Sequence, residues 1–319
     1  MMKQGQTIPR PRVQKQKLSR LALTEERWGY LFISPWILGF VVFIVGPMLA
    51  SLYFSFTQYS FPLTPRWIGL GNYIQAFTKD ELFPLSLWNT VYYVGLSVPL
   101  GVLLSLALAL LMDRNMPARP LWRTIYYLPS IVPTVAAAFL FLYIFQPDYG
   151  LINGWIWKLL GVEGPGWFNS RTWVKPTLII LSLWAAGGPT MIIILAGLQN
   201  IPSELYDAAE VDGAGRWHKF LNITLPMLSP TLFFVFVTGL IGAFKIFSAA
   251  YVSTGGGPFY GSYFYVLHLF TEAFTHWNLG YASALAWILF VIILLFTLFQ
   301  FKLAGRWVYY ESDTLDEVK

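Results

Sequence analysis

Long apolar stretches separated by short polar connections dominate the chain. Six of them are long enough to cross a bilayer, which takes about 20 consecutive apolar residues. We expect the spans at residues 28–56, 90–112, 125–145, 174–198, 227–252 and 281–303. Each should be helical, because a segment inside lipid has to satisfy its own backbone N–H and C=O groups. The pattern predicts an all-α integral membrane protein with six transmembrane helices.

Proline and glycine interrupt the predicted spans. The interruptions are Pro35, Pro47, Pro99, Pro129, Pro133 and the run Gly187-Gly188-Pro189. A membrane tolerates the hydrogen bond that proline removes where a neighbouring helix or a wet cavity satisfies the freed carbonyl. Broken helices around a midplane cavity are typical of transporters. Proline is also commoner in membrane helices generally, so no single position marks a cavity by itself.

Basic residues are distributed unevenly over the two sides of the predicted bundle. Of the 21 Lys and Arg residues, fifteen lie before residue 28, in the connections 113–124 and 199–226, or after residue 301. Five lie in the other three connections and their flanks, and Lys245 lies inside a span. Because cytoplasmic loops carry the excess of Lys and Arg, we place both termini in the cytoplasm.

Composition supports the membrane assignment and narrows the chemistry. Apolar residues make up 56% of the 319 residues and charged residues 12%, against roughly 45–50% and ~25% in soluble domains. The chain has no cysteine, and its three histidines are scattered without metal-ligand spacing, so we predict no disulfide, thiolate or metal site. The net charge of +5 follows the topology and gives no reason to expect nucleic acid.

The spans divide the chain into a cytoplasmic basic segment at 1–27, a six-helix transmembrane domain at 28–304 and a cytoplasmic tail at 305–319. The basic segment mixes charged and apolar residues, and we expect it at anionic lipid headgroups. A cleaved signal peptide is the alternative. Its apolar core would be 7–15 residues, and the run from Trp28 is about twice that length.

The cytoplasmic connection at 199–226 reads as a helix, a glycine turn and a second short helix. Ser203 can cap the first helix, and Glu204 and Asp207 complement its positive end. Gly213 supplies the turn, where a positive φ is free of Cβ strain. Small residues let another protein approach the backbone closely: Ala208, Ala209 and Ala214. An ordinary capped pair of surface helices is the alternative.

The spacing of this connection resembles the EAA loop of binding-protein-dependent ABC importer permeases. The resemblance rests on Asp207-Ala208-Ala209, then Gly213, Ile223 and Leu225-Pro226, with Asp207 where the family usually has Glu. Five further stretches, in the right order, are similar to signatures of maltose-type carbohydrate permeases: 67–73, 123–129, 147–153, 254–258 and 280–287.

The resemblance implies a maltose-permease-like, MetI-like fold in the inner membrane and a transporter subunit that is not an enzyme. Its partners would be a second homologous permease, a homodimeric cytoplasmic ATPase and an extracytoplasmic solute-binding protein that delivers a sugar. ATP and Mg would be bound by the ATPase, since this chain has no G-x-x-x-x-G-K-[ST] loop. The residues implied in coupling are Glu204, Asp207, Ala208, Ala209, Asp212, Gly213, Ala214, Ile223, Leu225 and Pro226.

Aromatic and polar residues within the spans are candidates for contact with a sugar. They are Asn89, Tyr92, Tyr93, Trp184, Lys245, Phe247, Ser248 and Tyr251. Packing or an interfacial aromatic belt is the alternative for each. Lys245 alone carries a formal charge well inside a predicted span, and a charge at that depth suggests a function. Its stem could also snorkel to the external surface.

Gly255-Gly256-Gly257-Pro258 follows the fifth span on the external side. A glycine run beside a proline can bend between two states, which suits an external gate, and a plain loop is the alternative.

The solute implied is a di- or oligosaccharide, with glycerol phosphate esters or acidic sugars next. A secondary transporter or a membrane enzyme is disfavoured, because no span holds a central carboxylate and no carboxylate pair lies at the membrane edge.

Overall fold

The computed structural model of the chain describes residues 20–114 and 116–309. By their internal contacts the residues form two compact units, Met1–Tyr53 and Phe54–Lys319. Most of the predicted basic segment 1–27, and the end of the tail 305–319, lie outside the described residues. Four described helices are long and apolar enough to cross a membrane, or six spans if each of two bent helix pairs counts as one. The predicted all-α membrane fold is confirmed.

The described part of the first unit is one continuous helix. Helix α1 (Arg20–Phe40) runs through a π-helical turn, η1 (Val41–Val45), into α2 (Gly46–Ser55). Large apolar side chains such as Phe32, Ile33 and Leu38 are exposed on different sides of it. A helix that is apolar all round is a membrane span. The first predicted span is therefore present, and its helix begins at Arg20 and not at residue 28.

Proline accounts for two of the π-helical turns. Both η1 and η4 (Phe220–Thr224) end two residues before a proline, Pro47 and Pro226. Proline has no N–H to donate, so a carbonyl one turn earlier loses its usual partner. In both turns the residue before the proline donates to the carbonyl five residues back. The helices thus continue past both prolines, and at Pro47 the sequence had suggested an interruption.

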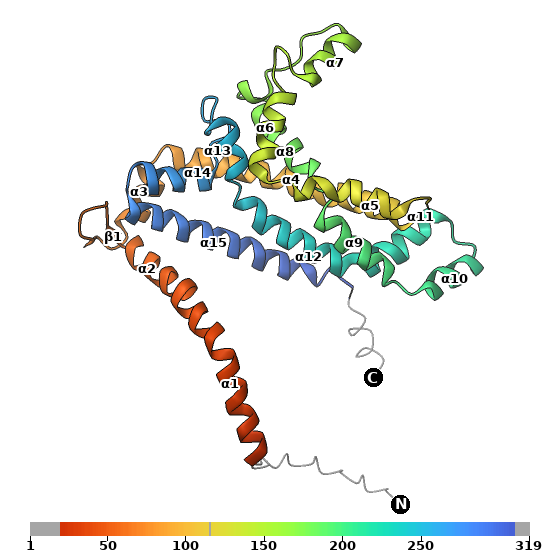
Figure 1. Ribbon diagram of the computed structural model, residues 1–319, viewed down its shortest axis with the longest axis horizontal. Coiled ribbons are helices and arrows are strands. Elements are labelled where there is room, and N and C mark those ends of the chain that lie inside the picture. The colour runs from red at the N-terminus through yellow and green to blue at the C-terminus, as the bar shows by residue number, and fades with distance from the viewer. Residues whose placement is uncertain (1–19, 115, 310–319) are drawn as a thin grey trace, which may run out of the picture. The chain divides into compact units, whose positions relative to one another are not determined.

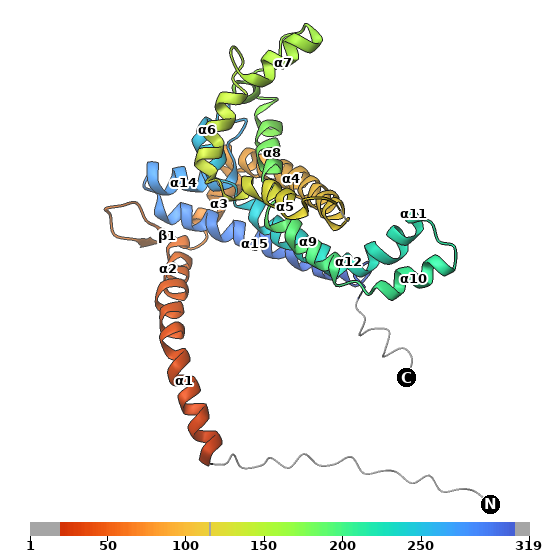
Figure 2. The same cartoon turned by 45° about the vertical axis from the view of Figure 1, so that its right-hand side comes forward.

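The second unit is organised around α4 (Leu82–Asp113), which packs against helices on several sides. Helices α8 (Val174–Trp184) and α9 (Pro189–Gln199) cover one side, α12 (Leu225–Phe244) covers another, and α15 (Leu279–Ala304) packs on α12. Figures 1 and 2 show α10 (Ser203–Val211) and α11 (Arg216–Lys219) at one end of α15 and α14 (Tyr265–Phe270) at the other. This agrees with the prediction that these connections lie on opposite sides of the membrane.

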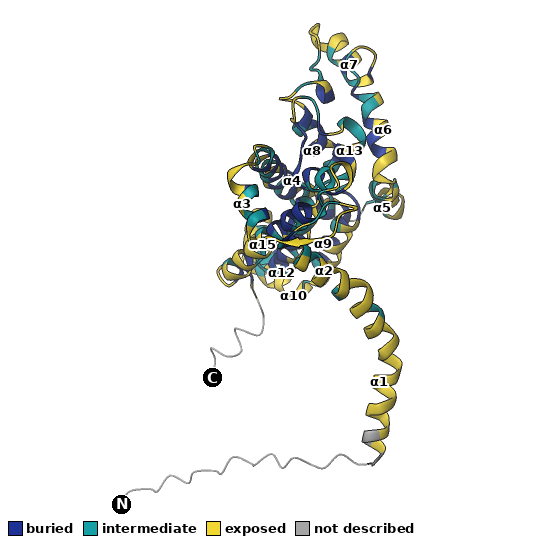
Figure 3. Cartoon of the chain, turned by 90° about the vertical axis from the view of Figure 1, so that its left-hand side faces the viewer, coloured by how far each residue is buried: buried dark blue, intermediate teal, exposed yellow. Residues whose placement is uncertain are grey.

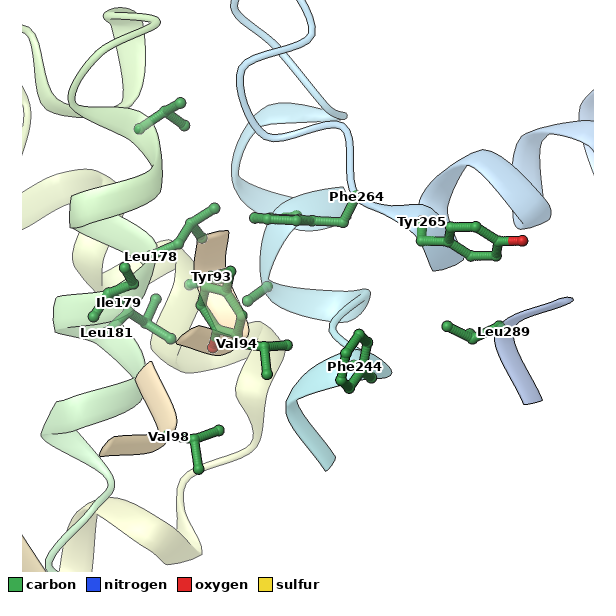
Figure 4. Packing of buried hydrophobic residues seen from close by; sticks show 14 of the residues in the cluster. Tyr93, Val94, Val98, Leu178, Ile179, Leu181, Phe244, Phe264, Tyr265 and Leu289 are labelled. Atoms are coloured by element: carbon green, nitrogen blue, oxygen red, sulfur yellow. The ribbon is translucent and has the colours of Figure 1, made fainter. Parts of the chain in front are cut away.

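The larger apolar core joins α4 to its neighbours. Figure 4 shows side chains of α4 lying between those of α8 and those of the segments around α12 and α14. The labelled residues are Tyr93, Val94, Val98, Leu178, Ile179, Leu181, Phe244, Phe264, Tyr265 and Leu289. In Figure 3 the buried residues gather where α4 and α8 meet, whereas α7 (Leu151–Leu160) is largely exposed.

Three of the predicted spans are broken. Helix α5 (Arg119–Tyr127) and η2 (Leu128–Ile131) meet α6 (Thr134–Ile144) at 96°, and α8 meets α9 at 50°. The expectation of a continuous fifth span to residue 252 is wrong: its helix ends at Phe244, and α13 (Ser248–Thr254) is separate. The N–H groups of Lys245 and Ile246 bond to carbonyls three residues back, which tightens and closes the helix end.

Short elements and the buried amide of Asn72 build a corner at the start of the second unit. Strands β1 (Thr57–Gln58) and β2 (Arg66–Trp67) pair antiparallel before α3 (Gly71–Thr78). The Asn72 amide donates to the carbonyls of Ser55 and Thr57 at 2.9 and 2.8 Å. The remaining short helices are η3 (Trp167–Asn169) and η5 (Thr271–Thr275). The predicted first external signature at 67–73 is thus a structural corner.

Asp80 ties three distant segments together, and sequence reasoning did not single it out. Its Oδ1 accepts the N–H groups of Leu82 and Phe83 at 2.8 and 3.1 Å, which caps α4. Its Oδ2 accepts from the Tyr281 hydroxyl at 2.5 Å and lies 2.7 Å from Nε2 of His268. Burial would raise the pKa of Asp80, but these donors and the charge of His268 hold it below its ordinary value of 3.8.

We expect Asp80→Asn to destabilise the chain by about 2–4 kcal/mol, because it leaves buried partners unpaired. The folded-state pKa is lowered, so the stabilisation is present above the unfolded value of about 3.8 and is lost as pH falls through the folded value. The gap in thermal stability between wild type and variant should therefore shrink below about pH 4. Asp148→Asn, at an exposed external site, is the control. A gap that is constant with pH would contradict this account.

Candidate solute cavity and coupling loop

A cavity of about 600 Å³ lies inside the second unit. Helix α4 forms one wall. The other walls come from the three places where spans are interrupted, between η2 and α6, between α8 and α9, and between α12 and α13. The volume falls in the usual range of ligand pockets, roughly 300–1,000 Å³. The broken spans therefore surround one site, as the proline and glycine pattern suggested for a transporter.

Serine side chains satisfy backbone carbonyls around these interruptions. The Ser105 hydroxyl of α4 donates to the carbonyl of Ala186 at 2.7 Å, inside the α8–α9 interruption. The Ser130 hydroxyl donates to the carbonyl of Tyr127 at 2.8 Å, beside the α5–α6 interruption. Irregular backbone is tolerated at membrane depth where such partners or a wet cavity are present.

Glycine at 187 and 188 lets two interruptions touch. A Cβ at Gly187 would lie 2.6 Å from the carbonyl oxygen of Tyr126, and one at Gly188 would lie 2.4 Å from Cβ of Ser130. Both distances are shorter than any contact a real Cβ makes. The fourth span can therefore pack its interruption against the third only because these positions lack side chains.

The cavity wall is rich in hydroxyl groups, with aromatic faces among them. Hydroxyls come from Tyr93, Ser97, Ser105, Ser130, Thr134, Ser182, Thr190 and Ser248. Trp184 and Phe247 add aromatic rings. The Ser97 hydroxyl is buried and makes no hydrogen bond within the described residues. Such a wall can meet the hydroxyls and the apolar ring faces of a sugar.

Lys245 lines the cavity at the point where α12 ends. Among the described residues that line the cavity, Lys245 alone carries a charge. No ion pair joins it to a described carboxylate. The carbonyls at the end of α12 carry a partial negative charge of about half a unit, which stabilises an ammonium there. The helix break places Lys245 beside the cavity. The alternative predicted from the sequence was a continuous helix along which the lysine stem snorkels to the surface.

The eight predicted path residues divide into two groups. Five of them line the cavity: Tyr93, Trp184, Lys245, Phe247 and Ser248. The other three lie outside it. Tyr251 stacks on Phe247 with ring centroids 5.2 Å apart, and Tyr92 lies under the ammonium of Lys175 at 5.3 Å.

Asn89 anchors the loop that precedes α14. Its amide nitrogen donates to the carbonyls of Tyr260 and Tyr263 at 2.9 and 3.1 Å, and its oxygen accepts from Lys175 at 2.9 Å. The amide nitrogen therefore holds the loop against α4, and the oxygen joins α4 to Lys175 of α8.

A pattern in the sequence could have found the serine wall. Tyr93, Ser97, Gly101 and Ser105 recur every four residues, so they lie along one side of α4. All four line the cavity. The hydroxyls of Ser97 and Ser105 are inconspicuous in an apolar stretch, which is why a search for charges and aromatics missed them.

The predicted external gate is a tightly bonded loop. The Ser262 hydroxyl donates to the carbonyl of Gly257 at 2.7 Å and lies 2.6 Å from the Thr254 hydroxyl. Gly256 has φ +95, and a Cβ there would lie 2.6 Å from the Tyr263 ring. Gly255 has φ +58 and open space around it, while Pro258 follows at the loop's tip. The structure holds one conformation of the loop, and its role as a gate stays a prediction.

The two glycines of this loop form a matched test. We expect Gly256→Ala to lower stability by about 2–4 kcal/mol, because the left-handed backbone and the clash with Tyr263 add together. Gly255→Ala should cost only about 1–2 kcal/mol from backbone strain. Thermal unfolding of both purified variants checks this. Equal losses would mean that the packing around Gly256 is looser than the structure shows.

The coupling loop begins with α10, an exposed helix. Pro202 occupies the N-cap position, and Ser203 makes no capping hydrogen bond, so the prediction for Ser203 is wrong. Proline supplies the extended backbone that starts the helix without a side-chain cap. Glu204 does lie in the first turn, and Gly213 has φ +77, as predicted. Asp207, Ala208 and Asp212 are exposed, while Ala209 and Ala214 are half-buried.

The second helix of the loop is longer than expected. Helix α11, η4 and α12 form one continuous run from Arg216 to Phe244. Ile223, Leu225 and Pro226 are therefore half-buried parts of the fifth span's helix. The π-helical turn at Phe220–Thr224 joins the short helix predicted in the loop to the fifth span without a break.

Two side-chain pairs brace the loop. Lys219 Nζ donates to Glu210 Oε2 at 2.7 Å, and the Tyr206 and Thr224 hydroxyls lie 2.9 Å apart. The hydrogen bond and charge of Lys219 hold the pKa of the exposed Glu210 below its ordinary value. Both pairs join α10 to the helix that continues into the membrane.

Fold and site define the class: a membrane permease of ABC importers with the MetI-like fold. The chain belongs to the family of binding-protein-dependent transport system inner membrane components, which matches residues 97–309. That family is a transporter component and not an enzyme.

Relatives and a solved structure agree with this assignment. The chain is 44% identical to the probable ABC transporter permease protein YesP of Bacillus subtilis (strain 168), over 93% of this chain and 96% of the relative. It is 34% identical to the trehalose/maltose transport system permease protein MalF of Thermococcus litoralis, over 90% and 97%. A chain of a bacterial ABC transporter involved in import of the acidic polysaccharide alginate superposes with a TM-score of 0.79 at 25% identity, covering 90% and 99%.

Proposed function

We propose that this chain is one of two homologous permease subunits of an importer in the cytoplasmic membrane. Both termini lie in the cytoplasm, a homodimeric ATPase binds the coupling loop, and an extracytoplasmic binding protein delivers the solute. ATP and Mg are held by the ATPase, and this chain binds no cofactor. The distribution of Lys and Arg supports the orientation, because it puts the end with α10 and α11 on the basic, cytoplasmic side.

The coupling loop is the observation that carries this proposal. Val211 and Trp217 are 89% and 76% exposed on the two helices of the loop, far more than a closed surface leaves large apolar residues. The loop is braced to the fifth span, and that span's end borders the cavity. A partner that binds the exposed side chains can therefore move the wall of the cavity.

A carbohydrate is the solute class that this cavity suits best. Hydroxyls and aromatic rings line it, and relatives are named for trehalose/maltose and for arabinooligosaccharides. A di- or oligosaccharide also matches a space of about 600 Å³ better than a monosaccharide does. Relatives named for sn-glycerol-3-phosphate and sulfoquinovosyl glycerol keep phosphate esters and acidic sugars within the class.

We expect Gly213→Val to uncouple ATP hydrolysis from uptake. A β-branched residue strains a backbone at φ +77 by roughly 1–2 kcal/mol, which shifts the turn and misplaces α10 on the ATPase. Solute uptake per ATP hydrolysed should fall about tenfold or more, while the complex still assembles. The measurement is uptake and ATP hydrolysis by the same proteoliposomes.

Gly215→Ser is the matched control. Gly215 lies two residues away in open space with φ −69, and serine is favoured at its N-cap position. Normal coupling is expected for this variant. Normal transport by the Gly213→Val complex would remove the assignment of residues 199–226 as the coupling loop.

A further inference from the structure

The charge of Lys245 has no counterpart in the part of the chain that the structure describes. The side chain is exposed to the cavity, and the described carboxylates form no ion pair with it. An unpaired charge at membrane depth is costly and is found where a pathway or a ligand needs it. Something that enters the cavity is the natural counter-charge.

The helix end behind Lys245 fixes where this charge sits. Because α12 stops at Phe244, Lys245 lies just beyond the helix end and lines the cavity together with Phe247 and Ser248. No continuous helix carries its side chain toward the external surface. The wall formed by α4 carries serine side chains, including the buried Ser97 hydroxyl, which makes no hydrogen bond within the described residues. The cavity thus combines one positive charge with neutral donors and acceptors.

We propose that the solute is a carbohydrate that carries a carboxylate, and that Lys245 selects it by binding that group. This inference rests on the proposed importer function and names its substrate class. The neutral sugar hydroxyls face the serine and threonine wall, and the ring faces lie against Trp184 or Phe247. The carboxylate and the ammonium form a charge-assisted hydrogen bond, which is about twice as strong as a neutral one.

Counting charges favours a carboxylate over a phosphate ester. A carboxylate has one negative charge, which the single ammonium neutralises. A phosphate monoester carries about −1.5 to −2 at neutral pH and would leave roughly one charge unpaired, which is expensive in a cavity inside the membrane.

The test uses the whole complex in lipid discs with Gly242→Cys in this chain, whose natural sequence has no cysteine; Gly242 lines the cavity, is exposed and has open space for a side chain. A hydrophilic thiol reagent labels the cavity. Protection is measured with a uronic-acid disaccharide and with the same disaccharide after its carboxyl group is reduced to an alcohol. We expect half-protection at a concentration about ten- to hundredfold lower for the acid, which is the usual range for a hydrogen bond to a charged group.

Variants of Lys245 separate charge from packing. Lys245→Met should raise the half-protection concentration of the acid to that of the reduced disaccharide, and Lys245→Arg should restore most of the difference. Lys302→Met, an exposed lysine outside the cavity, should behave like wild type.

Several outcomes would overturn the inference. Equal protection by both disaccharides would mean that the cavity does not select a carboxylate. A uniform loss of protection in Lys245→Met would mean that the lysine pairs with an acid of the second permease. Stronger protection by glycerol 3-phosphate would replace the carboxylate with a phosphate. In each case ATPase stimulation by a loaded binding protein, measured on the same discs, shows separately whether the importer function holds.

Discussion

The requirement that every backbone polar group inside a bilayer be satisfied governs this structure. Straight helices meet it internally, so α4 and α15 cross without interruption. The third, fourth and fifth spans break instead, and all three breaks border one cavity. Serine hydroxyls and the open cavity provide partners for the backbone groups that those breaks leave unpaired at membrane depth. A site for a polar solute and a set of broken helices are therefore two aspects of one arrangement.

The same constraint links the cavity to the proposed coupling loop. The fifth span's helix starts in the coupling loop at Arg216 and ends at Phe244, directly before Lys245. The π-helical turn at Phe220–Thr224 keeps that helix continuous past Pro226. Two side-chain pairs fix α10 to it. One rigid element thus runs from the surface offered to a partner to the wall of the cavity, with no flexible segment between them.

Much of this could be read from the sequence. Apolar length predicted the spans, and the spacing around Asp207 and Gly213 predicted the loop and its positive φ. Continuity at proline could not be predicted, because a π-helical turn bypasses Pro47 and Pro226 whereas the chain bends beside Pro133. The break at Lys245 has no proline to announce it. The Asp80, His268 and Tyr281 cluster joins residues that are roughly 200 positions apart in the chain, and only the fold brings them together.

We propose that this chain passes a movement, driven by ATP hydrolysis in a partner, to the wall of a solute cavity. The most direct measurement is ATPase activity of the chain co-expressed with candidate permease and ATPase partners, purified in lipid discs, and tested with binding proteins loaded with different sugars. The account predicts that one loaded binding protein stimulates hydrolysis several-fold. A stably inserted chain that recruits no ATPase would contradict it and favour a secondary transporter.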